Sequence, residues 1–377
     1  MENGEVLPIF KGVRYFGNEL QNNSTDAPKK KIDCYYSLRL VPEYMKPQMV
    51  LPSILKRNII KQVNWGYAIH LDGTASIDEY LEGQFKSKYR SIIRRYVKRL
   101  EHCFPIRYEL FYGEIDEDIY YFVMDSLRQM IVHRFGQRQE THKEFHRWQD
   151  LVKETYQKIL DKDASLFVIY DGEHPIQISL NYHFDKILFS AISSYDIDYA
   201  KFGLGHIEIY KQLQWCIENG HCVYEMGVGG MDYKRRWSNT IYQYQHHIIY
   251  PENRPLAKLF ASIEINRVKL KEYLKSKNVN ELIYRVKDRI VKKKAAQNGT
   301  DLNVVNIAAV DTSISIKEYD ELKNLKSEAR FLKKYLYDFL YSKVENIDDV
   351  SVLQSQKDSK NFIFKGKSAA QHLEFEK

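Results

Sequence analysis

Five polar side chains flank one glycine-rich segment in the second half of the chain, and their types suit proton transfer and anion binding. Tyr195 and Asp196 stand before it, and Glu225, Tyr233 and Lys234 follow it. A carboxylate can accept a proton, a tyrosine can donate one, and a lysine can hold a phosphate or a developing oxyanion. Each type also has a structural alternative. Asp196 can cap a turn, Glu225 can pair with an arginine, and Tyr233 can pack in the core.

Lys234 is the hardest of these residues to explain as part of the structure. It follows the glycine-rich run 227–230 and precedes Arg235 and Arg236. We therefore assign Lys234 to a cofactor phosphate or to the oxyanion. Asp232 is a further carboxylate, but its position before Tyr233–Trp237 predicts the N-cap of a short helix.

The glycine-rich segment itself predicts a helix that begins at a phosphate site. Gly203 and Gly205 precede an apolar stripe with helical spacing that ends at Asn219 and Gly220. The first turn of a helix has backbone N–H groups without intrahelical partners, and glycine lets a phosphate approach them. The predicted contacts to a pyrophosphate are Phe202, Gly203, Leu204, Gly205 and His206. The structural alternative is a tight turn into a core helix.

Alternating and helical patterns on both sides predict the elements that hold these residues. The order is strand, two helices, three meandering strands, the glycine turn with its helix, a strand, a short charged segment and a closing strand. The ranges are Ile106–Tyr112, Asp116–His133, Lys143–Leu160, Leu166–Tyr170, Ile176–Phe184, Ile187–Ser194, Cys222–Met226 and Ile241–Ile248.

This order resembles the GNAT acyltransferase fold, an α+β fold with a mixed, mainly antiparallel sheet flanked by helices. Four segments resemble the CelD/BcsL-type acetyltransferase family, a relative of the FemAB-like aminoacyl transferases. They are KSKYRSIIRRYVKRLE at 86–101, SSYD at 193–196, FGLGHIEIYK at 202–211 and DYKRRW at 232–237. The resemblance covers residues of about 60 to 250. The chain departs from the usual GNAT turn at Ala200, where the family has Arg or Gln.

The resemblance implies an N-acyltransferase that uses acetyl-CoA as co-substrate and acylates an amino sugar or similar polar amine for cell-surface polysaccharide. It implies an oxyanion contact from backbone N–H groups at Ser193–Asp196 and a thiolate that Tyr233 protonates. Two alternatives stay open. One is a FemAB-like transferase that uses aminoacyl-tRNA, although the chain has no tRNA-specific motif. The other is a non-catalytic binding module, which the residue at Ala200 supports.

A basic helix precedes the first strand of this order. Ser76 and Glu79 have the spacing of a capping box, and one long helix is predicted from there to Glu101. One face is apolar and the other is cationic. Arginine binds phosphate and carboxylate through two parallel hydrogen bonds, so Arg90, Arg94 and Arg95 are predicted to hold an anionic acceptor. A solvated helix surface is the alternative.

The remaining patterns predict five parts of the chain. They are a flexible lead-in at 1–31, a smaller N-terminal lobe at 32–103, the catalytic domain at 104–250, a helical extension at 251–296, and a linker, amphipathic helix and loose polar tail at 297–377. The lobe is predicted to contain strands at Ile32–Val41 and Tyr67–Leu71 and a helical stretch near Ser53–Lys61. The apolar stripe from Leu256 to Leu274 predicts a helix or a pair of helices. The basic helix Val279–Lys294 predicts either a solvated surface or contact with an anionic membrane.

Composition limits the remaining possibilities. The chain has 377 residues, a formal charge of +7 and no apolar run of signal-peptide or transmembrane length, so we expect a cytoplasmic protein. Its four cysteines form no CxxC pair, which argues against a disulfide framework and against a zinc site. His142 and His146 have the spacing of metal ligands on a helix, but no third ligand accompanies them. We expect no metal.

Overall fold

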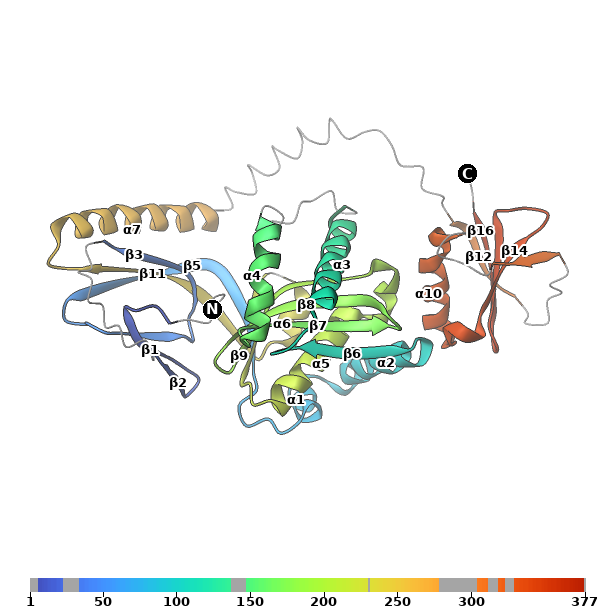
Figure 1. Cartoon of the computed structure of the whole chain (residues 1–377), viewed down its shortest axis with the longest axis horizontal. Helices are drawn as coiled ribbons and strands as arrows, with labels where there is room; N and C mark the ends of the chain where they lie inside the picture. The colour runs from blue at the N-terminus through green and yellow to red at the C-terminus, as the bar shows by residue number, and fades with distance from the viewer. Residues whose placement is uncertain are drawn as a thin grey trace, which may run out of the picture. The chain divides into compact units, whose positions relative to one another are not determined.

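The computed structural model describes residues 6–22, 34–136, 147–229, 231–277, 304–310, 318–322 and 329–375 (Figure 1). These residues form two compact units. The first contains Met1–Gly73, Tyr182–Phe189 and Gly220–Asn298, and the second contains Thr74–Asn181, Ser190–Asn219 and Gly299–Lys377.

The largest sheet has eight strands in the order β3-β11-β5-β10-β9-β8-β7-β6. Their bounds are β3 Tyr36–Pro42, β5 Leu55–His70, β6 Ile106–Phe111, β7 Ala164–Asp171, β8 His174–Phe184, β9 Ile187–Tyr195, β10 Val223–Val228 and β11 Thr240–Pro251. The β10–β9 pair is parallel, whereas β10–β5, β11–β5, β11–β3 and β6–β7 are antiparallel. This confirms the predicted α+β class with a mainly antiparallel sheet.

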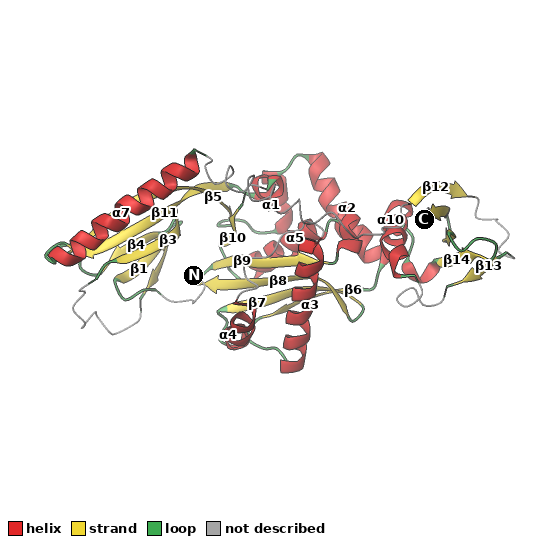
Figure 2. Cartoon of the chain, turned by 90° about the horizontal axis from the view of Figure 1, so that it is seen from above, coloured by secondary structure: helices red, strands yellow, loops and turns green. Residues whose placement is uncertain are grey.

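In the first unit, the helix α7 (Pro255–Ser276) packs on β5 and β11, and a three-stranded sheet packs on the other face of these two strands (Figure 2). The small sheet has the order β2-β1-β4, with β1 Phe10–Tyr15, β2 Asn18–Gln21 and β4 Lys46–Met49. Neighbouring side chains of β11 point to opposite faces, so Ile248 joins a cluster with α7 and Ile249 a cluster with β1.

Two predictions for this unit are wrong. The lead-in at 1–31 is not wholly flexible, because β1 and β2 pair within it and bury Phe10 and Tyr15. The helical stretch near Ser53–Lys61 is part of the 16-residue strand β5. Pairing with β11 along most of its length fixes this strand, and a local pattern does not reveal such a distant partner.

In the second unit, helices lie on both sides of β6, β7 and β8 (Figure 1). The helices are α1 Ile77–Gln84, α2 Ser87–Cys103, α3 Glu117–Gly136, α4 Trp148–Leu160 and α5 Leu204–Glu218. Ser76 caps α1 and accepts a hydrogen bond of 3.1 Å from the Glu79 N–H, as predicted. The predicted single helix is nevertheless two helices, because the backbone is extended at Phe85 and Lys86.

The C-terminal part of this unit is a second, antiparallel sheet with the order β12-β16-β15-β14-β13. Its strands are β12 Val304–Val310, β13 Tyr319–Glu321, β14 Ser351–Ser355, β15 Asn361–Lys365 and β16 Ala370–Phe375, and the helix α10 Lys333–Lys343 packs on it. The described part of the tail from Glu345 is therefore folded and not loose. The amphipathic helix, which the sequence pattern predicts over Ile316–Val344, is only partly confirmed, because the described residues of that range include β13 and the 3-10 helix η3 (Arg330–Leu332) as well as α10. Side chains of α10 and this sheet share one hydrophobic core with Phe104, Tyr199 and Phe202.

His142, His146 and the segment Val279–Lys294 lie outside the described residues. None of the helices in the described part of the chain has the length and apolarity needed to cross a membrane.

Candidate active site

The glycine turn forms the N-terminus of α5, as the sequence predicted. Gly203 has a left-handed backbone with a φ of 67°, ends the 3-10 helix η2 (Ile197–Phe202) and precedes α5. A Cβ at Gly203 would lie 2.8 Å from the ring of Tyr96, so a side chain there would be both strained and crowded. At Gly205 a Cβ would meet no described atom within 4 Å. The backbone at Gly205 is therefore open to approach at the positive end of the helix dipole.

The other predicted cofactor residues point elsewhere. Phe202 and Leu204 are buried in the hydrophobic core of the second unit. The ring of His206 stacks on Tyr96 with centroids 5.7 Å apart. The turn therefore offers its backbone to a ligand, whereas these three side chains serve packing.

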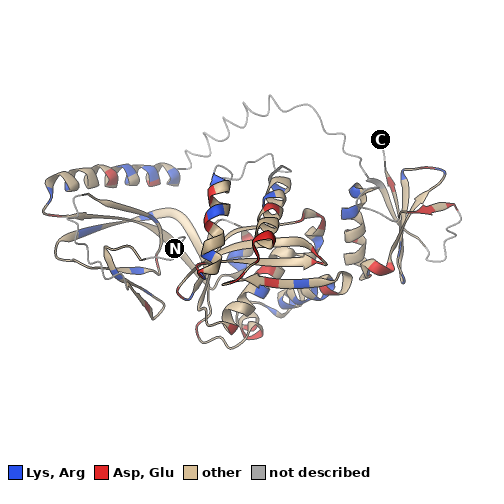
Figure 3. Cartoon of the chain, in the orientation of Figure 1, with Lys and Arg blue, Asp and Glu red and all other residues tan. Residues whose placement is uncertain are grey.

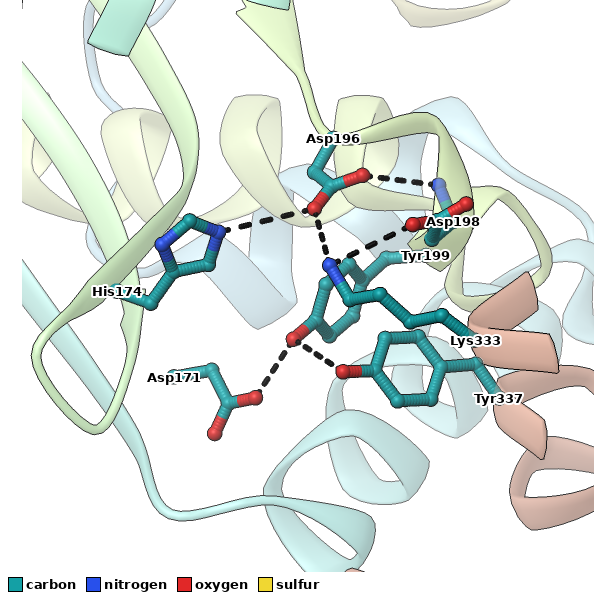
Figure 4. Close-up of polar contacts among 7 residues, drawn as sticks. All are labelled: Asp171, His174, Asp196, Asp198, Tyr199, Lys333 and Tyr337. Carbon is teal, nitrogen blue, oxygen red and sulfur yellow. Dashed lines mark hydrogen bonds and ion pairs between the residues drawn. The ribbon is translucent and has the colours of Figure 1, made fainter. Parts of the chain in front are cut away.

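Asp196 stabilises the start of η2 through a hydrogen bond and an ion pair (Figure 4). Its Oδ1 accepts a hydrogen bond of 3.0 Å from the Asp198 N–H, and its Oδ2 lies 2.8 Å from the Lys333 Nζ of α10. The His174 ring is 3.8 Å from the same oxygen. Burial alone would raise the pKa of Asp196, but the bond from His174 and the charge of Lys333 hold that pKa well below its usual range. Such a carboxylate is a poor proton acceptor near neutral pH.

The contacts beside Asp196 hold α10 against η2 (Figure 4). The Tyr199 hydroxyl donates to the Asp171 Oδ2 at 2.6 Å, and its oxygen is 3.3 Å from that of Tyr337 on α10. Lys333 also lies 3.4 Å from Asp198. Asp196 is thus an anchor for the C-terminal sheet and its helix, which agrees with the structural alternative for this residue.

The aromatic ring of Tyr195 forms a cation–π contact with an arginine. The Arg134 guanidinium carbon of α3 stands 4.7 Å from the centre of the Tyr195 ring. The neighbouring Ser193 donates its hydroxyl to the buried carboxylate of Glu208 on α5 at 2.7 Å. The strand predicted to supply the oxyanion contact is therefore tied to α5 by a side-chain bond.

Glu225 is the fully buried carboxyl group of the first unit. It lies on β10, where the register with β5 shifts between Glu225 and Val228 and where Gly227 has a φ of 71°. This irregularity turns the Gly227 N–H to the Glu225 Oε1 at 2.7 Å. The Tyr44 hydroxyl donates to the other oxygen at 2.8 Å. Tyr44 is 181 residues away in the chain, so it could not be predicted as a partner of Glu225.

The surroundings place the titration of Glu225 near neutral pH. Burial raises the pKa of Glu225 to about 7, and the side chains of Tyr242 and Tyr44, the Gly227 N–H and the Lys234 charge limit the rise. A carboxyl group with that pKa exchanges protons at physiological pH, as a general base must. Among the three candidate carboxylates of the sequence, Glu225 alone combines complete burial with a pKa shifted into this range.

Lys234 has the structural role that the sequence did not reveal. Its Nζ donates to the carbonyl oxygens of Met226 at 2.6 Å and Val228 at 3.1 Å, so it holds the end of β10. It lies with the half-buried Tyr233 on α6 (Asp232–Trp237). The N-cap of α6 is Met231, and Asp232 occupies the first helical position, so the predicted cap at Asp232 is wrong by one residue.

The three arginines predicted to bind the acceptor differ in their contacts. Arg90 donates to the Phe85 carbonyl at 3.0 Å, where the chain breaks between α1 and α2. Arg94 forms an ion pair of 2.7 Å with Asp78. Arg95 is exposed on α2. Arg90 and Arg94 therefore brace α1 and α2 against each other, and Arg95 is the better candidate for an anionic acceptor.

Within the described ranges, no group of three or more His, Cys, Asp or Glu side chains could hold a metal ion.

One family model matches this chain. Residues 87–235 match the model described as "Acetyltransferase (GNAT) domain". The chain contains a GNAT-type acyltransferase domain. The match covers less than half of the chain, and domains of this type commonly use acyl-CoA. The matched range includes α2, the glycine turn, Glu225 and Lys234.

The likenesses to solved structures are distant. The chain is similar to the crystal structure of FemX at 13% identity and a TM-score of 0.41, over 56% of this chain and 69% of that one. It is also similar to a conserved protein of unknown function from Bacteroides thetaiotaomicron at 10% identity and a TM-score of 0.37, over 53% of this chain and 64% of that one. It thus spans less than two thirds of the latter protein's length. None of the curated proteins compared with the chain matches it.

Proposed function

We propose that this protein is an acyl-CoA-dependent N-acyltransferase that transfers an acetyl group from acetyl-CoA to a polar amine. The observation that carries the proposal is the GNAT domain at residues 87–235. The open backbone at Gly205, on the first turn of α5, supports it, because a pyrophosphate needs close approach to N–H groups. The residues at this turn therefore fit the diphosphate of coenzyme A.

The acceptor in this proposal is an amino sugar or similar amine in cell-surface polysaccharide synthesis. It rests on the resemblance of Ser193–Asp196, Phe202–Lys211 and Asp232–Trp237 to the CelD/BcsL-type family. Arg95 would contact an anionic group of such an acceptor, since it is exposed beside the paired Arg94.

Glu225 is the proposed base and Tyr233 the proposed acid. An amino-sugar nitrogen has a pKa of roughly 8, like an α-amino group, and a base with a pKa of about 7 can remove its proton at physiological pH. The amine nitrogen then forms a bond to the acyl carbon, the carbon–sulfur bond breaks, and the Tyr233 hydroxyl gives a proton to the thiolate. Lys234 supports this step by fixing the backbone around the Glu225 strand end.

Titration calorimetry with acetyl-CoA on two matched glycine variants tests the donor site. Gly205 and Gly83 both lie in helices, and a Cβ at either would meet no described atom within 4 Å. Valine is a better helix former than glycine, so both variants should fold. We expect Gly205→Val to weaken acetyl-CoA binding at least about tenfold, or about 1.4 kcal/mol, and Gly83→Val to leave it unchanged.

The outcomes separate the alternatives. Equal affinity of Gly205→Val and wild type would remove the glycine turn from the donor site. No binding of acetyl-CoA by the wild type would reject the donor, and binding of aminoacyl-tRNA would then favour the FemAB-like alternative. Binding of acetyl-CoA without acylation of any amine acceptor would favour a non-catalytic module.

A further inference from the structure

The helix α7 has two apolar faces, and only one of them packs on the protein. Ala261 and Val268 are buried against Ile60 and Ile248 of the sheet, and Ala257 is buried as well. The apolar stripe with the large side chains lies about 130° around the helix from this buried face.

The second face is exposed to solvent, and we call it the outer face of α7. Its large apolar side chains are between 40% and 70% exposed, and they are Leu256, Leu259, Phe260, Ile263, Leu270 and Leu274. Single exposed apolar residues are common on protein surfaces, but six on one face of one helix form an apolar strip, which the exposed Asn266 and Arg267 interrupt between Ile263 and Leu270. From Leu256 to Leu274 the strip runs along roughly 27 Å.

The charges of α7 are divided between the two faces. Both acidic residues of the helix are buried on the packed side, where Glu264 accepts from Ser37 at 3.1 Å and Glu272 accepts from the Val63 N–H at 2.9 Å. The exposed charged residues of the helix are all basic (Figure 3), and they are Lys258, Arg267, Lys269 and Lys271. The outer face therefore presents only apolar, neutral and cationic side chains.

The apolar strip and the absence of exposed acidic residues favour one binding partner for the outer face of α7 over the others. A second copy of α7 would bring basic residues against basic residues. The chain that follows, with Lys292, Lys293 and Lys294 in sequence, is also cationic. The surface of an anionic lipid bilayer offers negative charge beside an apolar layer, which suits a helix with large apolar residues on one side and basic residues at its flanks.

We propose that the outer face of α7 binds the surface of an anionic lipid bilayer, with the helix axis parallel to the membrane. The large apolar side chains enter the boundary between headgroups and acyl chains, and Lys271, which borders them on the helix surface, contacts the lipid phosphates. The inference does not depend on the proposed acyl transfer.

Vesicle flotation with the purified full-length chain tests this binding. One set of vesicles contains phosphatidylcholine only, and the other contains equal parts of phosphatidylcholine and phosphatidylglycerol. We expect the chain to float with the anionic vesicles and not with the neutral ones, and we expect added salt to weaken the binding. Equal binding to both sets, or binding to neither, would overturn the proposal.

Two matched substitutions locate the binding surface. Ile263→Glu places a charge in the strip, and Ile119→Glu makes the same change at an isoleucine of α3 that is 43% exposed. Transfer of an isoleucine side chain from water to the apolar layer is favourable and transfer of a carboxylate is not, so Ile263→Glu should weaken vesicle binding at least about tenfold while Ile119→Glu binds like wild type. Equal effects of the two changes would contradict the assignment to α7. Self-association that Ile263→Glu abolishes, without vesicle binding, would show that a second copy covers the face.

Discussion

Replacement of Glu225 by glutamine should change how stability depends on pH. Glutamine has the same shape, and its amide can accept from the Gly227 N–H and donate to the Tyr44 hydroxyl, so the local bonds of Glu225 can persist. Only the ionisation is lost. The pKa of Glu225 is about 7 in the folded protein, and its ordinary value is 4.5.

The sign and size of the effect follow from these two pKa values. Below pH 4.5 Glu225 is protonated in both states, and its burial carries no ionisation cost. Between pH 4.5 and 7 unfolding releases a proton, so rising pH destabilises the wild type by about 1.4 kcal/mol per pH unit. The full loss is about 3 kcal/mol above pH 7. Glu225→Gln lacks this loss and should gain that much relative stability between pH 4 and pH 8.

Urea denaturation of both proteins at several pH values measures the difference. Glu117→Gln on α3 removes an exposed carboxylate and controls for the change in net charge. If the difference in unfolding free energy between Glu225→Gln and wild type stays constant from pH 4 to pH 8, Glu225 does not titrate near neutrality. The proposed base would then have to be sought elsewhere.

Two further substitutions test the proposed acid, Tyr233, and the anchor between Lys333 and Asp196. Tyr233→Phe keeps the ring but removes the proton, so kcat should fall by roughly 10² to 10⁴ with unchanged affinity for acetyl-CoA, and a wild-type rate would exclude Tyr233 as the acid. Lys333→Met should leave Asp196 uncompensated and lower the unfolding free energy by about 3 kcal/mol, with faster hydrogen exchange over 329–375. Lys334→Met, at an exposed neighbouring lysine, is the control, and equal effects of the two changes would refute the anchor.

The elements nearest the glycine turn could be predicted because local patterns specify them. The turn at Asp171 and Gly172 separates two alternating runs, and the glycines at 203 and 220 bracket an apolar stripe, so β7, β8 and α5 were correct. Only the last part of strand β5 was predicted, as Tyr67–Leu71, because KRNIIKQ in its first half has no strict alternation. Its conformation depends on β10 and β11, which come more than 150 residues later.

In the candidate site, too, some features could be predicted from the sequence and others could not. Glu225 could be selected by residue type, but the complete burial that raises its pKa could not be predicted, because residues from distant parts of the chain, such as Tyr44, cover it. Asp196 differs, because Lys333 lies 137 residues further on, pairs with it and makes it an anchor. A carboxylate in a sequence is therefore only a candidate. The burial and the charges that the fold brings to it decide whether its pKa rises to about 7, as for Glu225, or falls well below its usual range, as for Asp196.

The helix α7 shows the same limit for apolar patterns. A periodic stripe identifies a helix, but it does not say which of two apolar faces meets the sheet. Here the face with Ala257 and Ala261 packs, because small side chains let the helix approach β5 and β11 closely, and the larger stripe is left outside. Burial of both acidic residues on the packed side then makes the outer face cationic as well as apolar. Flotation with anionic vesicles would show whether this second stripe is a membrane-binding surface.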